Sequence, residues 1–263
     1  MREWTAEAIV AAAAAWVWVP QDAEQVRTEQ YQLVRYPEHY LTSRVSVAWS
    51  RSGRPVDELL EEIGRHARGW GHDEVEWTVS AATRPQSTEE ELVRRGAKLA
   101  ETAQVLAFDM NQGLPELGAP AGVSWEVVGD AAGVRAGRVI YREVWGDGGE
   151  PDEAEVERGV AEAEEELADW SGFRVVSFVD GEPASFGGCT LVDGVARLWG
   201  AGTRGSLRGR GAYRAVLAGR MALAREHGAT LALVKGRVET SAPILRRAGF
   251  GVYGEERSYR VAV

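Results

Sequence analysis

The chain has 263 residues, which is enough for one large domain or two of ordinary size, and its 44% hydrophobic content is typical of a globular protein. The formal net charge of −10 argues against nucleic acid or an anionic membrane as the main partner, because both favour a basic surface. A single cysteine, Cys189, excludes an intramolecular disulfide framework and fits a reducing compartment. The apolar run at 9–19 is too short to span a bilayer and has no basic segment before it, so we expect a cytoplasmic protein without a signal peptide.

The first 112 residues alternate between strand and helix patterns. A helix is predicted at 4–19, with Thr5 as its N-cap and Pro20 after its end. The following predicted elements are strands at 32–36 and 43–49, a helix from Pro55 to about Trp70, a strand at 74–81, a helix with a capping box at Ser87 and Glu90, and a strand at 98–110. The polar stretch at 21–30 is expected to form a turn or loop.

Glycines and prolines then concentrate at 113–122, which predicts a linker between one domain at 1–112 and another at 123–263. The second domain is predicted to contain a strand at 123–128, a helix after Asp130, a loop at 146–151, an acidic helix at 152–170, strands at 173–179, 184–191 and 195–203, a helix at 212–227, a strand at 229–234, a short helix that ends at Gly249, and final strands at 250–263. Asp180-Gly181 and Asp193-Gly194 are hairpin signals. The order β-α-β-α-β occurs in both halves, which indicates a diverged internal duplication.

The stretch Arg208-Gly209-Arg210-Gly211-Ala212-Tyr213-Arg214 lies between a predicted strand and a predicted helix. Its glycines allow the backbone to turn and to approach a ligand closely. The unpaired N–H groups of the first helical turn and the helix dipole favour an anion at this place. The sequence therefore predicts a binding site for a pyrophosphate-bearing ligand.

Competing motifs are weaker. Residues 200–205 match G-x-G-x-x-G, but further glycines delay the helix to Ala212 and the preceding strands are hairpin-linked, so a nicotinamide cofactor is disfavoured. The chain has no phosphate-binding G-x-x-x-x-G-K-[ST] pattern and no G-x-S-x-G pattern of a serine hydrolase. The four histidines are scattered, and we expect no metal site.

Residues 123–263 resemble the GNAT-type N-acetyltransferase superfamily. The resemblance is carried by the strand 197–203, by the loop 208–212, which matches the first four positions of [QR]-x-x-G-x-[GA], by the helix after it, and by the ending 243–250. The sixth position departs from the pattern, since it is Tyr213. The resemblance implies an α/β fold with a mixed sheet and two acetyltransferase-like domains in tandem, the first of them degenerate.

The resemblance also implies acetyl-CoA as a co-substrate and a small-molecule primary amine as the acceptor. The pyrophosphate is expected on the backbone of 209–214, and the pantetheine arm is expected along 201–203, where Gly202 would supply an oxyanion donor. The implied donor-binding residues are Ala201, Gly202, Thr203, Arg208, Gly209, Arg210, Gly211, Ala212, Tyr213 and Arg214. Acetyl or a longer acyl group is possible on the donor, and the acceptor class stays open.

The catalytic groups are less well specified. Where many relatives carry a tyrosine acid this chain has Leu245, and the strand 195–203 has no carboxylate. Glu239 is the candidate base, although a solvated or helix-capping carboxylate is the simpler interpretation. Cys189 is expected to be buried packing rather than a nucleophile. A catalytically silent acyl-CoA-binding or regulatory module is therefore the alternative to an enzyme.

Two segments are candidates for acceptor contacts. The acidic helix 152–169 is interpreted first as a solvated face paired through Arg158, and the loop 146–151 is the better candidate. At the corresponding junction of the first domain, Gly53 is the only glycine and Pro55 has no N–H to donate. We expect this domain to bind no CoA, and to stabilise the second domain or shape its acceptor groove.

Overall fold

The computed structural model describes residues 3–20, 22–38, 40, 44–118, 120–146 and 148–263. Two compact units are built from interleaved segments of the chain. The N-unit comprises residues 10–105, 236–243 and 252–263, and the C-unit comprises residues 1–9, 106–235 and 244–251. The sequence predicted a different division, into contiguous domains at 1–112 and 123–263. That division stays a prediction.

The N-unit carries the strand order β1-β2-β3-β4-β11-β5. Its elements are β1 (Glu24–Arg27), β2 (Tyr31–Arg35), β3 (Val45–Ser50), α2 (Val56–Gly69), β4 (Glu74–Ser80), α3 (Thr88–Arg94), β5 (Lys98–Asp109) and β11 (Gly251–Ala262). Strands β3 and β4 are parallel, and β11 is antiparallel to β4. The alternation of strands and helices predicted for the first half is observed from β3 to β5.

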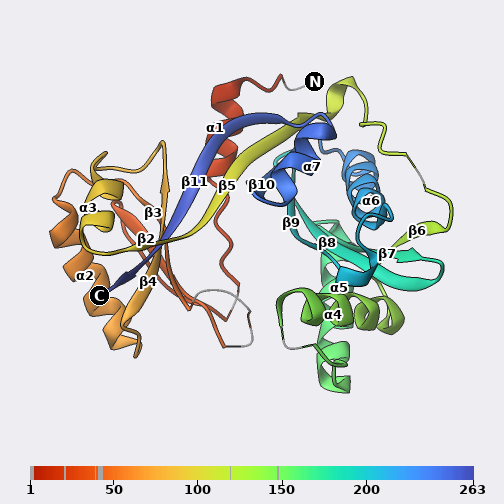
Figure 1. The fold of residues 1–263 in the computed structure, drawn as a ribbon, viewed down its shortest axis with the longest axis horizontal. Helices are drawn as coiled ribbons and strands as arrows, with labels where there is room; N and C mark the ends of the chain where they lie inside the picture. The colour runs from red at the N-terminus through yellow and green to blue at the C-terminus, as the bar shows by residue number, and fades with distance from the viewer. Residues whose placement is uncertain (1–2, 21, 39, 41–43, 119, 147) are drawn as a thin grey trace. The chain divides into compact units, whose positions relative to one another are not determined.

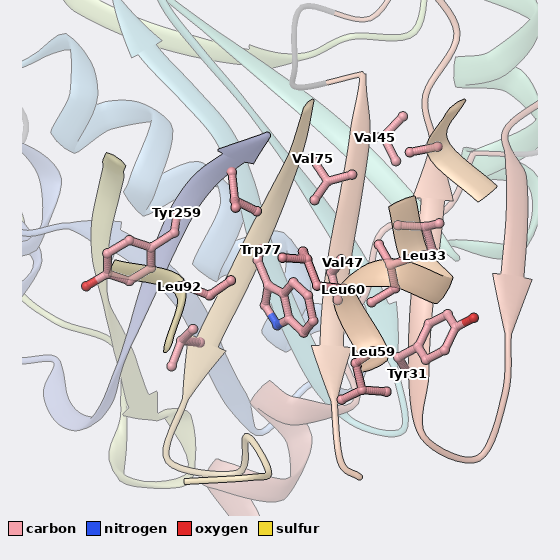
Figure 2. Close-up of a cluster of buried hydrophobic side chains, with 14 residues drawn as sticks. Tyr31, Leu33, Val45, Val47, Leu59, Leu60, Val75, Trp77, Leu92 and Tyr259 are labelled. Atoms are coloured by element: carbon pink, nitrogen blue, oxygen red, sulfur yellow. The ribbon is translucent and has the colours of Figure 1, made fainter. Parts of the chain in front are cut away.

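Trp77 of β4 lies at the centre of the N-unit core, where Leu59 and Leu60 of α2 pack near Leu33 and Val47 (Figure 2). Its side chain is fully buried, and its indole N–H donates to Ser50 Oγ at 3.2 Å. Helix α2 buries an apolar stripe formed by Val56, Leu59, Leu60 and Ile63.

The C-unit carries the strand order β5-β10-β9-β8-β7-β6, with β5 supplying residues to both units. Its other elements are β6 (Val123–Val127), α4 (Ala131–Trp145), α5 (Glu153–Asp169), β7 (Gly172–Val179), β8 (Glu182–Val192), β9 (Val195–Thr203), α6 (Ala212–Glu226), β10 (Leu231–Arg237) and α7 (Ser241–Arg247). Strands β6 to β9 are antiparallel neighbours, whereas β9 and β10 are parallel. The mixed α/β sheet predicted from the sequence is thus observed.

Helices cover both faces of strands β6 to β9, with α4 and α5 on one face and α6 on the other (Figure 1). Gly137 of α4 packs against Phe186 of β8, and Gly219 of α6 packs against Trp125 of β6. Both glycines permit a close helix approach, since a Cβ at either position would lie under 3.0 Å from the facing ring.

The predicted N-caps of two helices are confirmed. Thr5 Oγ1 accepts from Ala8 N at 3.2 Å at the start of α1 (Ala6–Ala14), and Asp130 Oδ1 accepts from Gly133 N at 2.8 Å at the start of α4. The hairpin turns are also confirmed, because Asp180 and Asp193 both adopt φ of 51° and are followed by left-handed glycines.

Three local predictions are wrong. Helix α1 ends at Ala14 rather than near residue 19, and β1 forms where a turn or loop was expected. The capping box at Ser87 is not formed, because that side chain makes no cap hydrogen bond; Thr88 Oγ1 donates to Pro85 O at 2.6 Å instead. Over the ranges that the structure describes, no helix is long and apolar enough to cross a membrane, and no three His, Cys, Asp or Glu side chains are grouped to hold a metal ion.

Candidate functional site

The glycine loop adopts the backbone that its sequence suggests. Gly209 and Gly211 have φ of 78° and 92°, and Gly211 is the N-cap of α6. No side chain caps this end of the helix, and its first turn carries no acidic residue. The first-turn N–H groups and the positive end of the dipole are therefore arranged to receive an anion.

The arginines of the loop are exposed around this helix end. Arg208 Nε donates to Thr203 O at 3.3 Å, and Arg210 forms an ion pair with Asp180 in the β7–β8 turn. Arg208, Arg210 and Arg214 have exposed side chains, so they are accessible to a phosphate group from solvent.

Gly211 is also constrained by a residue outside the loop. A Cβ at Gly211 would overlap the ring of Pro120, with Pro120 Cδ at 3.3 Å. The sequence interpretation attributed the need for glycine here to a close approach of the ligand, and the structure adds a close approach of the chain itself. Gly209 differs, since nothing lies within 4 Å of a Cβ at that position.

Strand β9 leaves its parallel neighbour before it reaches the loop. The register with β10 runs from Val195↔Leu231 to Leu198↔Val234, whereas the register with β8 continues to Thr203. Residues 199–203 therefore extend beyond the paired part of β10. Their backbone lies at the edge along which the resemblance predicts a pantetheine arm.

A β-bulge accompanies this divergence. Between the partner pairs Gly188↔Trp199 and Phe186↔Gly202, β8 has one residue and β9 has two. The first of these two, Gly200, has φ of 58°, which is the left-handed glycine typical of a G1 bulge. The sequence interpretation placed Gly200 only in a competing nucleotide motif; a glycine inside a strand pattern was the signal for the bulge.

Gly202, the predicted oxyanion donor, lies against the end of α4. A Cβ at this position would lie 2.6 Å from the ring of Trp145 and 2.9 Å from Val144. The carbonyl of Gly202 accepts from Ser185 Oγ at 2.7 Å. These contacts fix the backbone of the strand at the point where the oxyanion donor is expected.

The predicted donor-binding residues lie along the chain between the end of β9 and the first turn of α6. Glu239 is not among them: it lies exposed in the turn between β10 and α7, and it belongs to the N-unit. Leu245, at the position of the tyrosine acid, is 1% exposed and lies in the core. Neither residue acquires a contact that would assign it a catalytic role.

Cys189 behaves as packing, as expected. It is fully buried in β8, and burial raises the pKa of its thiol to about 12 although Arg220 acts in the opposite direction. A thiol with so high a pKa is a poor nucleophile near neutral pH. Tyr259 of β11 donates its hydroxyl to Glu89, and burial together with this carboxylate raises its pKa to about 12.

Four acidic side chains of α5 are paired with basic residues of other elements. Arg135, Arg138 and Arg142 of α4 contact Glu153, Glu162 and Glu155 respectively, and Arg174 of β7 contacts Glu162 and Glu166. The expected pairing through Arg158 within the helix is replaced by these pairs between elements. This neutralisation weakens the case for α5 as a cation-attracting surface.

The loop at 146–151 is held to α4 by Arg142. Its Nη1 donates to Glu150 O at 2.9 Å, and its own carbonyl accepts from Gly146 N and Gly148 N. Asp147, which the sequence interpretation included in this loop, lies outside the described residues.

The corresponding junction of the N-unit is closed by its own chain. Arg84 N donates to Ser50 O at 3.0 Å, and Ser52 N donates to Arg84 O at 3.1 Å. This parallel bridge occupies backbone hydrogen-bonding groups at the end of β3. At the corresponding place in the C-unit, residues 199–203 of β9 extend beyond the part that is paired with β10. In addition, the first turn of α2 carries Asp57 and Glu58, which oppose an anion at that helix N-terminus.

Several solved structures have a fold similar to that of this chain. A GCN5-related N-acetyltransferase from Kribbella flavida aligns with a TM-score of 0.65 at 21% identity, covering 97% of this chain and 95% of its own. The fold is that of the GCN5-related N-acetyltransferases (GNAT). A tandem GNAT protein from the clavulanic acid biosynthesis pathway aligns with a TM-score of 0.61 at 14% identity, covering 96% and 87%. A GCN5-related N-acetyltransferase from Sphaerobacter thermophilus aligns with a TM-score of 0.61 at 18% identity, covering 89% and 81%.

At these identities the likeness concerns the GNAT fold alone. No protein-family model and no curated protein matches the sequence. The activity must therefore be argued from the residues of this chain.

Proposed function

We propose that this protein is an acyl-CoA-dependent N-acyltransferase that transfers acetyl from acetyl-CoA to a primary amine. The observation that carries the proposal is the left-handed glycine loop at the N-terminus of α6, directly after the extended edge of β9. A pyrophosphate suits the N-terminus of α6, and an amide-bearing pantetheine arm suits the extended edge of β9.

The donor supplies an activated thioester, and the chain supplies binding and orientation. The amine attacks the thioester carbonyl, a C–N bond forms, and the C–S bond breaks to release CoA thiolate. Gly202 N–H is the proposed donor to the oxyanion. The amine must lose one proton, and Glu239, the candidate from the sequence, stays the proposed base.

The proposal predicts one donor site per chain, in the C-unit. Calorimetric titration with acetyl-CoA is expected to give a stoichiometry of one. Absence of binding at millimolar donor would contradict the proposal.

A matched pair of variants tests where that site lies. Gly209→Asp places a carboxylate beside the N-terminus of α6, in open space and in a backbone conformation that Asp tolerates better than most residues. Gly53→Asp does the same at the junction before α2, also in open space. We expect at least a tenfold loss of acetyl-CoA affinity for Gly209→Asp and none for Gly53→Asp. Equal losses in both variants, with both still folded by circular dichroism, would refute the single site.

A catalytically silent acyl-CoA-binding module is the second candidate. It is favoured by the buried Leu245 in place of a tyrosine acid and by the absence of a carboxylate from the sequence of β9. Release of free thiol from acetyl-CoA with a panel of amines distinguishes the two. Turnover with any amine supports the enzyme, whereas tight binding without turnover supports the silent module.

A further inference from the structure

Arg220 is a buried arginine on the sheet-facing side of α6. It is 1% exposed, and the neighbouring residues of α6 on this side are also buried: Val216, Leu217, Met221 and Ala224. Burial of a guanidinium is costly unless its donors are satisfied. Burial lowers the pKa of Arg220, whereas neighbouring Tyr213 and Cys189 raise it.

The partners of Arg220 in the described chain are carbonyls and a phenol rather than carboxylates. Nη1 lies 3.2 Å from Gly188 O and 3.4 Å from Trp199 O, and Nε lies 3.4 Å from Val216 O. The Tyr213 hydroxyl lies near enough to Arg220 for the two side chains to shift each other's pKa. One cation therefore connects β8, β9 and its own helix, beside Tyr213.

These contacts coincide with the bulge in β9. Gly188 and Trp199 are the cross-strand pair directly before the bulge, and Leu198 is the last residue of β9 in register with β10. A Cβ at Gly187, opposite the bulge, would lie 3.0 Å from Arg220 Cζ and 3.1 Å from the Cβ of Ala201. The guanidinium thus lies beneath the point where β9 diverges from β10.

Tyr213 places the end of the glycine loop beside Arg220. It lies seven residues before Arg220, which is close to two helical turns, so both side chains project from the same face of α6. The position is small in the sequence pattern that this chain resembles, and here a tyrosine fills it. Burial raises the pKa of Tyr213, although Arg220 lowers it.

We propose that Arg220 is a positioning residue for the donor: it holds the bulge of β9 and, through Tyr213, fixes the glycine loop relative to residues 201–203. The inference rests on the proposed acetyl-CoA site. Its consequence is that loss of Arg220 misplaces the strand edge that would bind pantetheine, while the helix N-terminus that would bind the nucleotide end is retained.

The test compares Arg220→Met, Arg220→Lys and Tyr213→Phe with Arg225→Lys, a control at an exposed position of the same helix. Affinity is measured for acetyl-CoA and for its nucleotide end, adenosine 3′-phosphate 5′-diphosphate, well below each variant's unfolding temperature. We expect acetyl-CoA affinity to fall at least tenfold in Arg220→Met, less in Arg220→Lys, and a few-fold in Tyr213→Phe. The affinity of every variant for the nucleotide end is expected to stay within twofold of wild type. The affinity of Arg225→Lys for acetyl-CoA is expected to do the same.

Folded variants that bind acetyl-CoA within twofold of wild type would overturn the inference, as would an equal loss of both ligands. If Arg220→Met does not fold, Tyr213→Phe decides, because it removes a single hydroxyl. Failure of the wild-type chain to bind acetyl-CoA would instead refute the proposed function.

Discussion

The two left-handed glycines of the loop should respond differently to the same substitution. Alanine at either Gly209 or Gly211 must adopt a positive φ, at a cost of about 1–2 kcal/mol. At Gly211 the added Cβ would also overlap the ring of Pro120, and overpacking of this kind costs about 1–3 kcal/mol more. We therefore expect Gly211→Ala to destabilise the protein by about twice as much as Gly209→Ala.

Thermal unfolding measures this difference. A loss of 1 kcal/mol lowers Tm by about 2–4 °C in chains of 150–250 residues, so Gly209→Ala is expected to lose about 2–8 °C and Gly211→Ala clearly more. Pro120→Ala removes Cγ and Cδ, the two ring atoms that the new Cβ would meet. In a double-mutant cycle it should recover the overlap part of the Gly211→Ala loss and leave the backbone part.

The same cycle with Gly209→Ala is the control and should show no coupling to Pro120. Equal losses for the two glycine variants, or additivity of Gly211→Ala and Pro120→Ala, would refute this account of the loop.

Two further predictions concern the C-unit. Asp130→Ala removes the cap of Gly133 N and is expected to destabilise the chain to urea by about 1 kcal/mol, whereas Asp130→Asn, which keeps an acceptor oxygen, should remain close to wild type; equal losses would contradict the capping role. Cys189, whose pKa is raised to about 12, should not react with an aromatic disulfide reagent at pH 8 until the chain is unfolded. Because its thiol pKa is higher in the folded state than in the unfolded state, its contribution to stability is complete below about pH 8.5 and is lost as pH rises towards 12. Rapid labelling of the native protein would refute this.

The local backbone of the candidate site could be predicted from sequence because its signals are local. The glycine pattern at 208–211, the Asp-Gly hairpins and the Asp130 cap each act through backbone preferences of a few adjacent residues. The structure follows these signals closely, including the left-handed glycines of the loop.

The features that sequence reasoning missed depend on residues far apart in the chain. Pro120 meets Gly211 across ninety-one positions, and Arg84 closes the β3 edge after an entire helix and strand. Two of the missed features did leave a signal in the sequence: Arg220 is a charged residue that interrupts an otherwise apolar helix face, and Gly200 is a glycine inside a strand pattern. Burial patterns locate such a residue, but its partners depend on the packing of the sheet.

Hydrogen–deuterium exchange with and without acetyl-CoA tests the central claim most directly. The account predicts protection of the amides of residues 201–203 and 209–214 on addition of the donor, and no change at residues 50–55. Protection at 50–55, or no protection of the glycine loop at saturating donor, would contradict a single donor site at the N-terminus of α6.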